Sequence, residues 1–217
     1  DMLQSERVAD LVECERQQVL AVLCDSLQPS PESLRYRTPF LGGVEHYKVR
    51  SSMNRVLSGA VLARHPSETD ERMMVRLLAF AMYANEFLSF GRGISGDEEP
   101  DIAHNDLTGA IETWISVGLP DERLIRKASG RANQVVVICY GRSADIWWNE
   151  NSKHLLRLKN LAVLKLPTQT TLALAALSNR TMQLQCTIQE GHIMMTSDAG
   201  MIDIEPVVLQ GKWNESH

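Results

Sequence analysis

The sequence predicts an α/β domain in which a mixed central sheet is flanked by helices. Apolar runs rich in β-branched residues, at 110–117, 134–140 and 161–166, alternate with segments of helical periodicity. An order of helix, strands, helix, strand, helix, strand, helix and hairpin is typical of layered α/β domains. The chain has 217 residues, 44% of them hydrophobic, which is enough for one core and one domain of ordinary size.

Charge and composition exclude several classes of protein. The formal net charge is −5, so we do not expect non-specific coating of nucleic acid, whereas a local acidic site for a divalent cation is compatible with this balance. No apolar stretch approaches the roughly 20 residues of a membrane span. The first residues lack the basic and then apolar order of a secretory signal. The four cysteines form no CxxC pair, which fits a reducing cytoplasm.

The first 60 residues predict little of the central sheet. Residues 3–27 have the spacing of an amphipathic helix, and the prolines at 29 and 31 end it. Residues 28–60 are expected to be loop with one or two short strands. We therefore divide the chain into a divergent N-terminal segment, residues 1–60, and a main domain, residues 61–217.

The main domain opens with a helix. Ser67 is the expected N-cap with Asp70 as its box partner, and apolar residues from Met74 to Met82 follow at helical spacing. The remaining predicted elements, in order, are a short strand at 86–90, an acidic loop at 91–100, a strand at 110–117, a helix from Pro120 to Gly130, a strand at 134–140, one or two helices at 144–160, a strand at 161–166, a helix at 170–177 and a hairpin at 183–196.

Acidic residues near the strand at 110–117 are the best candidates for chemistry. Asp106 precedes this strand, and Glu112 shares one of its faces with Trp114 and Ser116. Lys127 follows on the next helix, at the edge of its apolar stripe. Carboxylates that hold Mg²⁺ and a lysine that steadies negative charge are the groups that metal-assisted phosphodiester hydrolysis needs. The alternative is that Glu112 and Lys127 are ordinary solvated side chains.

Two further glutamates lie in the first turn of the helix that follows Ser67. Glu71 points along the apolar stripe and can reach the end of the sheet as another acidic ligand, or it serves the helix dipole. For Glu68 the dipole is the favoured interpretation. His65, in the preceding loop, is a second-rank candidate for a general base.

Some residues suggest contacts with nucleic acid. Trp147 and Trp148 offer a base-stacking platform, although helical geometry predicts one in the core and one half-exposed. Basic residues follow Pro120 on the predicted helix and can contact phosphates, or they form a solvated helix face: Arg123, Arg126, Lys127 and Arg131.

Several motifs in register resemble the YaeQ family of bacterial proteins. They are residues 62–74 (LARHPSETDERMM), 106–112 (DLTGAIE), 118–122 (GLPDE), 146–148 (IWW) and 180–189 (RTMQLQCTIQ). The resemblance runs from about Leu62 to the end of the chain. It implies a variant of the restriction-endonuclease-like, PD-(D/E)XK fold, with a mixed central sheet and flanking helices.

The resemblance also implies site residues. By position, the family's acids correspond to Asp106, Glu112, Glu68 and Glu71, and the family's helix lysine corresponds to Lys127. Ser116 departs from the pattern, because the family usually carries a glutamate there and serine supplies no anionic metal ligand.

Two functions follow as expectations. One is a cytoplasmic nuclease or phosphodiesterase that depends on Mg²⁺ or Mn²⁺, with Asp106, Glu112 and Glu71 as metal ligands and Lys127 as the catalytic lysine. The other is a non-catalytic module that binds nucleic acid or a protein on the same framework, which Ser116 and the net negative charge favour.

Overall fold

The computed structural model describes eight stretches of the chain: residues 18–24, 45–49, 60–64, 67–85, 87–91, 99–179, 182–189 and 192–213. Their largest sheet has six strands in the order β12-β8-β7-β6-β5-β4. In chain order these are β4 (Leu88–Phe90), β5 (Ile102–Asn105), β6 (Ile111–Val117), β7 (Ala132–Cys139), β8 (Leu161–Lys165) and β12 (Val207–Gln210). The three central strands, β6, β7 and β8, run parallel, and the other neighbours pair antiparallel.

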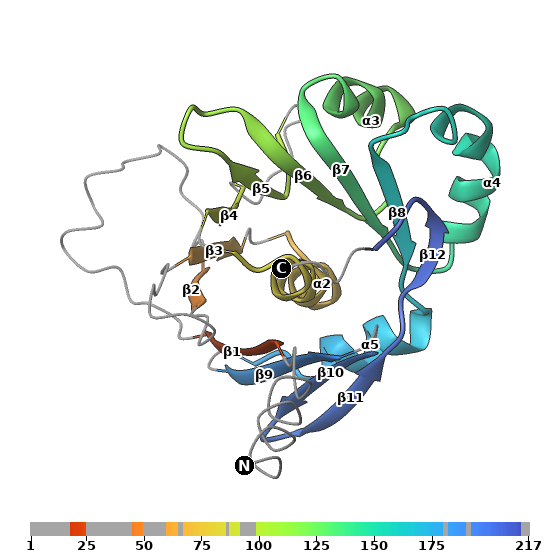
Figure 1. The fold of residues 1–217 in the computed structure, drawn as a ribbon. Helices are drawn as coiled ribbons and strands as arrows, with labels where there is room; N and C mark the ends of the chain where they lie inside the picture. The colour runs from red at the N-terminus through yellow and green to blue at the C-terminus, as the bar shows by residue number, and fades with distance from the viewer. Residues whose placement is uncertain are drawn as a thin grey trace, which may run out of the picture.

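Two crossover helices cover one face of this sheet, α3 (Glu122–Ser129) and α4 (Ala144–Leu155) (Figure 1). Parallel neighbours require such crossovers, and each helix buries a narrow apolar stripe. The core beneath these helices also contains those residues of the parallel strands that face α3 and α4, among them Val135, Val137 and Val163. The two helices therefore form one layer, whose outer side faces solvent.

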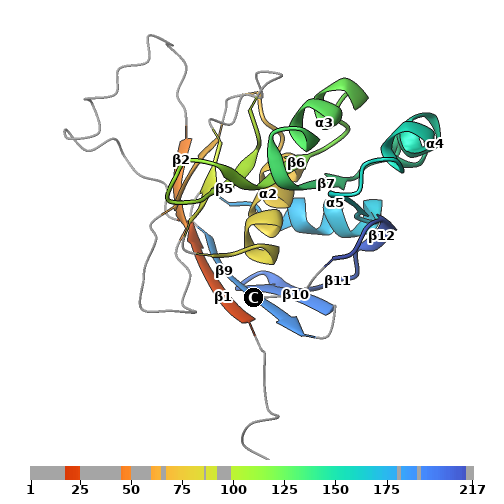
Figure 2. The ribbon, with the colours of Figure 1, turned by 45° about the horizontal axis from the view of Figure 1, so that its top comes forward.

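The opposite face packs on α2 (Asp70–Met82), which lies between the six-stranded sheet and a second sheet (Figures 1 and 2). The second sheet has the order β1-β9-β10-β11, and α5 (Thr168–Ala176) packs beside α2. Its strands are β1 (Gln18–Cys24), β9 (Met182–Gln189), β10 (His192–Ser197) and β11 (Gly200–Ile204). A two-stranded sheet joins β2 (Glu45–Val49) to β3 (Ala60–Arg64). Every residue of α2 from Met73 to Met82 is buried, as this enclosed position demands.

The structure corrects two expectations. Residues 18–24 are not helical, because β1 pairs antiparallel with β9 along its whole length (Figure 2). The helix α2 is capped by Thr69 rather than Ser67: the Thr69 hydroxyl accepts a hydrogen bond from the backbone N–H of Arg72 at 3.2 Å. A threonine one residue before the first helical turn outcompetes a serine three residues before it.

The centre of the main domain is confirmed. The strands β4, β6, β7 and β8, the helices α2, α3 and α5, and the β9–β10 hairpin all lie where the pattern predicts them, and residues 144–155 form a single helix. The strands β5, β11 and β12 were not predicted. None of the helices in the described part of the chain is both long and apolar enough to cross a membrane.

Candidate functional site

A buried pair of opposite charges lies at the start of α2. Arg76 is fully buried and donates from Nη1 to both carboxylate oxygens of Glu68, at 2.9 and 3.0 Å. The Glu68 side chain is only 2% exposed. A buried charge is tolerated when it is paired and hydrogen-bonded, so each residue accounts for the burial of the other. Glu68 thus fixes the loop before α2 and is not a solvated first-turn acid.

The adjacent Arg72 extends this network to the six-stranded sheet. Its Nη2 donates to Oδ1 of Asp101 at 2.6 Å, and its Nη1 donates to the carbonyl oxygen of Val117 at 2.6 Å. The second oxygen of Asp101, Oδ2, accepts from the backbone N–H of Val117 at 2.7 Å. Asp101 precedes β5 and Val117 ends β6, so one arginine clamps α2 to both strands of this hairpin. Both oxygens of the Asp101 carboxylate are occupied.

A pocket of about 280 Å³ opens beside this network. It lies at the carboxyl end of β6, the edge at which open α/β sheets bind ligands. Arg72, Glu99, Asp101, Trp114, Ser116 and Leu119 are among the residues that line it. The Ser116 hydroxyl accepts a hydrogen bond from the indole Nε1 of Trp114 at 3.0 Å. Ser116, at the position where the family resemblance expects a glutamate, therefore lines this pocket with a neutral side chain that is engaged by Trp114.

Glu71 and Tyr140 lie at the same end of the sheet. The Thr171 hydroxyl of α5 donates to Oε1 of Glu71 at 2.6 Å, which links α2 to α5. Burial raises the pKa of the Tyr140 phenol, while the nearby Arg72 charge opposes this shift. Tyr140 is thus a neutral phenol at neutral pH, able to donate or accept hydrogen bonds.

Asp106 lies at the other end of β5, because the five residue steps across this strand separate it from Asp101 by roughly 16 Å. Its Oδ1 accepts hydrogen bonds from the Thr108 hydroxyl at 2.7 Å and from the backbone N–H groups of Thr108 and Ala110, each at 2.8 Å. The Thr108 hydroxyl is the main cause that lowers the pKa of the Asp106 carboxyl. These contacts make Asp106 the residue that holds the β5–β6 turn.

Glu112 and Lys127 have different neighbourhoods. Oε2 of Glu112 accepts from the side-chain amide of Asn133 at 2.9 Å, at the amino ends of β6 and β7. Lys127 is exposed in the last turn of α3, on the solvent side of that helix. Neither residue lines the pocket at the carboxyl end of β6.

The expected convergence of Glu71, Asp106 and Glu112 is therefore wrong. Across the part of the chain that the structure describes, only His192, Asp203 and Glu205 bring three metal-ligating atoms within 4.8 Å of one another. The pocket is a poor fit for a resident divalent ion: of its two lining acids near Ser116, Glu99 and Asp101, the second is engaged by Arg72 and a backbone N–H, and Ser116 is neutral. The catalytic and ligand roles of Glu71, Asp106, Glu112 and Lys127 stay predictions. His65 lies outside the described residues.

The tryptophan pair has the predicted arrangement. Trp147 is buried and its Nε1 donates to the carbonyl oxygen of Pro120 at 2.9 Å, whereas Trp148 is half-buried. Trp147 therefore secures the loop that lines the pocket and is not available for stacking on bases.

The sequence also holds a signal for the buried Glu68–Arg76 pair, which the pattern analysis did not use. Arg76 is the single charged residue between Met73 and Met82, in an otherwise apolar run. A charge in such a run has to be buried and paired, which points to a carboxylate nearby.

Asp101 and Glu99 are, from the sequence, the acids of the preceding loop that could accompany Ser116, and both line the pocket beside it. The pairing of Asp101 with Arg72 could not be predicted, since the two residues are 29 positions apart in the sequence.

Comparisons with known proteins agree with this fold. A family model described as "YaeQ protein" matches residues 52–206. The protein named "Uncharacterized protein YaeQ" of Escherichia coli strain K12 is 46% identical over 151 residues, covering 69% of this chain and 83% of its own length. Its Salmonella typhi counterpart is 44% identical over 160 residues, covering 72% and 88%.

Solved structures extend the match to three dimensions. The crystal structure of the YaeQ protein from Xanthomonas axonopodis pv. citri has 38% sequence identity and a TM-score of 0.69, and the alignment covers 90% of this chain and 99% of that one. The Pseudomonas syringae YaeQ structure has 34% identity and a TM-score of 0.68, covering 71% and 86%. The chain described here belongs to the YaeQ family.

Proposed function

We propose that this chain is a non-catalytic nucleic-acid-binding protein that contacts phosphates through the layer formed by α3 and α4. The observation that carries the proposal is the distribution of charge. Residues 120–165 contain nine lysines and arginines against four aspartates and glutamates, a net charge of +5 in a chain whose total is −5. A basic surface on an acidic protein is the electrostatic footprint of local phosphate binding.

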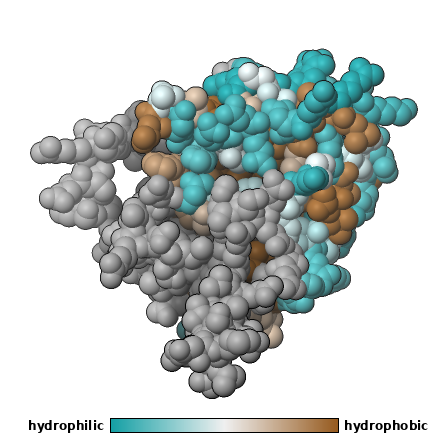
Figure 3. Space-filling view, in the orientation of Figure 1, coloured by the Kyte–Doolittle hydropathy of each residue, from teal (hydrophilic) through white to brown (hydrophobic). Residues whose placement is uncertain are grey.

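Four of these basic residues gather at the amino ends of β7 and β8. The Asn160 amide donates to the carbonyl oxygens of Ser129 and Ala132, each at 3.0 Å, and so ties the end of α3 to the loop after α4. Exposed basic side chains flank both sides of this tie, and we name the group the basic junction: Lys127, Arg131, Arg157 and Lys159. Figure 3 shows hydrophilic surface over the region of α3.

Helix electrostatics do not explain the basic junction. A basic residue in the last turn of a helix gains about 0.3–1 kcal/mol from the helix dipole, and this effect falls off beyond that turn. Lys127 lies in the last turn of α3, but Arg131 follows the end of that helix, and Arg157 and Lys159 follow the end of α4. Arg131 also lies over the ring of Trp114, 5.4 Å from its centroid, which holds the guanidinium in place.

The alternative is a metal-dependent phosphodiesterase. The observation in its favour is that Glu99 and Asp101 line the pocket beside Ser116, so acids are present near the position at which the family pattern has a glutamate. The observation against it is that the Asp101 carboxylate already accepts hydrogen bonds from the Arg72 guanidinium and from the backbone N–H of Val117. We derive no catalytic step through a metal ion from these residues.

Fluorescence anisotropy with labelled single-stranded and duplex oligonucleotides tests the proposal. We expect saturable binding at low salt that weakens at least tenfold when Arg157 and Lys159 are both replaced by glutamate. The matched control replaces Arg123, in the first turn of α3, and Arg142, just before α4, with glutamate; both lie away from the basic junction. This control should change the affinity less than threefold. Equal loss in both double variants, or no binding by the wild-type chain, would overturn the proposal.

Two further arms separate the alternatives. Incubation of the same oligonucleotides with Mg²⁺ or Mn²⁺ should leave them intact, and cleavage that is lost in Asp101→Asn would instead establish the phosphodiesterase. Polyglutamate should compete weakly. If it displaces the oligonucleotide at equal charge concentration, the surface recognises acidic protein chains and the nucleic-acid proposal is wrong.

A further inference from the structure

The second sheet carries a group of potential metal ligands on its exposed face. In the β10–β11 pair, Ile193 lies opposite Ile204, and both are buried in the core. Side chains alternate along a strand, so the residues next to these isoleucines point to the other face. That alternation places His192 on β10 and both Asp203 and Glu205 on or just after β11, all on the solvent side.

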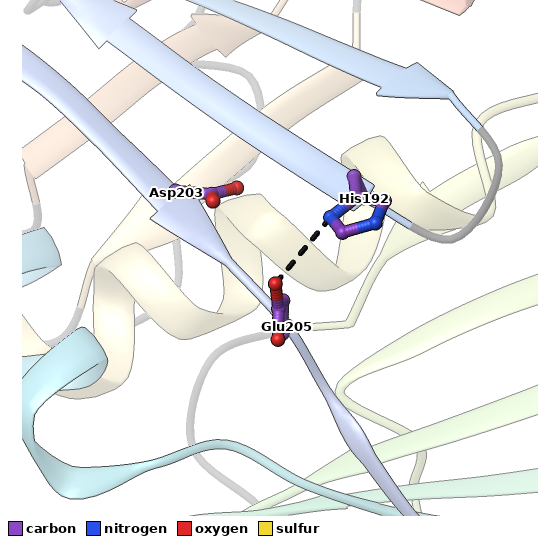
Figure 4. A group of neighbouring side chains, drawn as sticks. All are labelled: His192, Asp203 and Glu205. Carbon is purple, nitrogen blue, oxygen red and sulfur yellow. Dashed lines mark ion pairs between the residues drawn. The ribbon is translucent and has the colours of Figure 1, made fainter.

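These three side chains point toward one another across the two strands (Figure 4). The Nδ1 atom of His192 lies 3.4 Å from Oε1 of Glu205, and one ligand atom from each of the three residues lies within 4.8 Å of the others. Ligand atoms around a tetrahedral zinc ion, each about 2.1 Å from the metal, lie about 3.4 Å apart. The His192–Glu205 spacing already meets this geometry, and the Asp203 carboxylate lies within 4.8 Å of both.

The donor set indicates the class of ion. One imidazole nitrogen and two carboxylate oxygens suit borderline divalent metals such as Zn²⁺, whereas Mg²⁺ and Ca²⁺ prefer oxygen ligands alone. Three protein ligands leave a fourth tetrahedral position for water. The two acids give the group a negative charge when His192 is neutral, which favours a cation over an anion.

We propose that His192, Asp203 and Glu205 form a binding site for one Zn²⁺ ion that cross-links β10 to β11. This site lies on the second sheet and is independent of the basic junction, so its test and the test of nucleic-acid binding can fail separately. A simple ion pair between His192 and Glu205 is the competing explanation of the geometry, and it needs no contribution from Asp203.

Isothermal titration of the full chain with ZnCl₂ distinguishes the two explanations. We expect a bound equivalent whose affinity falls at least tenfold, or which disappears, in each of two variants, His192→Gln and Asp203→Asn. The matched control is Asp198→Asn, an exposed aspartate in the β10–β11 turn outside the group. Its titration should match that of the wild-type chain. Because each variant differs at one position, zinc bound elsewhere on the chain cancels from the comparison.

Thermal unfolding supplies a second readout. An ion that binds only the folded state raises Tm by an amount that grows with the ratio of its free concentration to Kd, so Zn²⁺ should raise Tm of the wild-type chain and of Asp198→Asn more than that of Asp203→Asn. With EDTA present, equal Tm values of the three proteins would show that the substitutions leave the fold intact. A smaller loss of zinc affinity than tenfold in either His192→Gln or Asp203→Asn would overturn the site.

Discussion

Arg72 and Asp101 form a 2.6 Å ion pair that joins α2 to the β5–β6 hairpin at the edge of the pocket. The Asp101 side chain is only 6% exposed and its second oxygen accepts a buried backbone N–H, so removing its charge would leave the facing donors without their partner. The same pair engages one of the acids that line the pocket. A carboxylate whose two oxygens are engaged by an arginine and an amide is committed to structure.

We therefore expect Asp101→Asn to lower the free energy of unfolding by about 1–3 kcal/mol, the usual range for losing a hydrogen-bonded charge partner. The control is Asp145→Asn, since Asp145 pairs with Lys165 at 2.7 Å but its side chain is 70% exposed. Exposed pairs contribute about 0–1 kcal/mol. Urea unfolding of both variants measures the difference, and equal effects would contradict a structural role for Asp101.

The buried Arg76–Glu68 pair predicts a non-additive result. Removing the arginine alone, as in Arg76→Met, leaves a buried carboxylate and should cost about 3–5 kcal/mol. The double variant Glu68→Leu with Arg76→Met removes both charges and should recover most of that loss. Urea unfolding of the two single variants and the double variant gives the coupling energy. A double variant as unstable as the sum of the single variants would show that the pair is not a coupled unit.

Two cysteines should resist alkylation in the folded protein. Burial raises the pKa of the Cys139 thiol to about 11 and that of the Cys186 thiol to about 12, from ordinary values of 9.0. Thiolate is the reactive species, so its fraction falls about a hundredfold and a thousandfold, respectively. A short pulse of iodoacetamide followed by peptide mass spectrometry should label both residues only after unfolding in guanidinium chloride. Rapid labelling of either one in the native state would contradict their burial.

The turn held by Asp106 predicts a dependence of stability on pH. Hydrogen bonds lower the folded-state pKa of Asp106 below its ordinary value of 3.8. A depressed carboxyl pKa stabilises the fold above the unfolded pKa and loses this effect as the pH falls through the folded pKa. The urea midpoint of the wild-type chain should thus exceed that of Asp106→Asn by a constant amount from neutral pH down to about pH 5, and the gap should close below about pH 4. The same gap at about pH 3 would be the contrary result.

The hydrophobic pattern of the sequence predicts the central strands of the six-stranded sheet correctly, but it does not predict several of the strands toward the edges of the fold. The strands β6, β7 and β8 are short apolar runs between turn residues, and the sequence alone locates them. The prediction of a helix at residues 18–24 was wrong because the apolar residues of this seven-residue strand fit helical spacing as well as strand spacing. Its pairing with β9, at the far end of the chain, decides between the two periods.

The candidate site shows the same division. The family resemblance singles out Ser116 as a position at which a glutamate is expected, and the structure places Ser116 in the pocket. Which acids accompany it depends on the direction of β5, a strand that was not predicted. That direction puts Asp101 beside the pocket and Asp106 at the opposite end, next to the turn. Carboxylates five residues apart, such as Asp101 and Asp106, cannot be assigned to one site before the strand between them is known.

The salt dependence of oligonucleotide binding tests the central claim most directly. Neutralised phosphates release counterions, so the logarithm of the association constant falls with the logarithm of salt concentration by about 0.7 per contact for single strands and about 0.9 for duplex DNA. Replacing Arg157 and Lys159 with glutamine should reduce this slope by about 1.4 or about 1.8, while the same replacement of Arg123 and Arg142 should leave it unchanged. Binding whose slope is near zero, or is equal in both double variants, would contradict phosphate recognition by the basic junction.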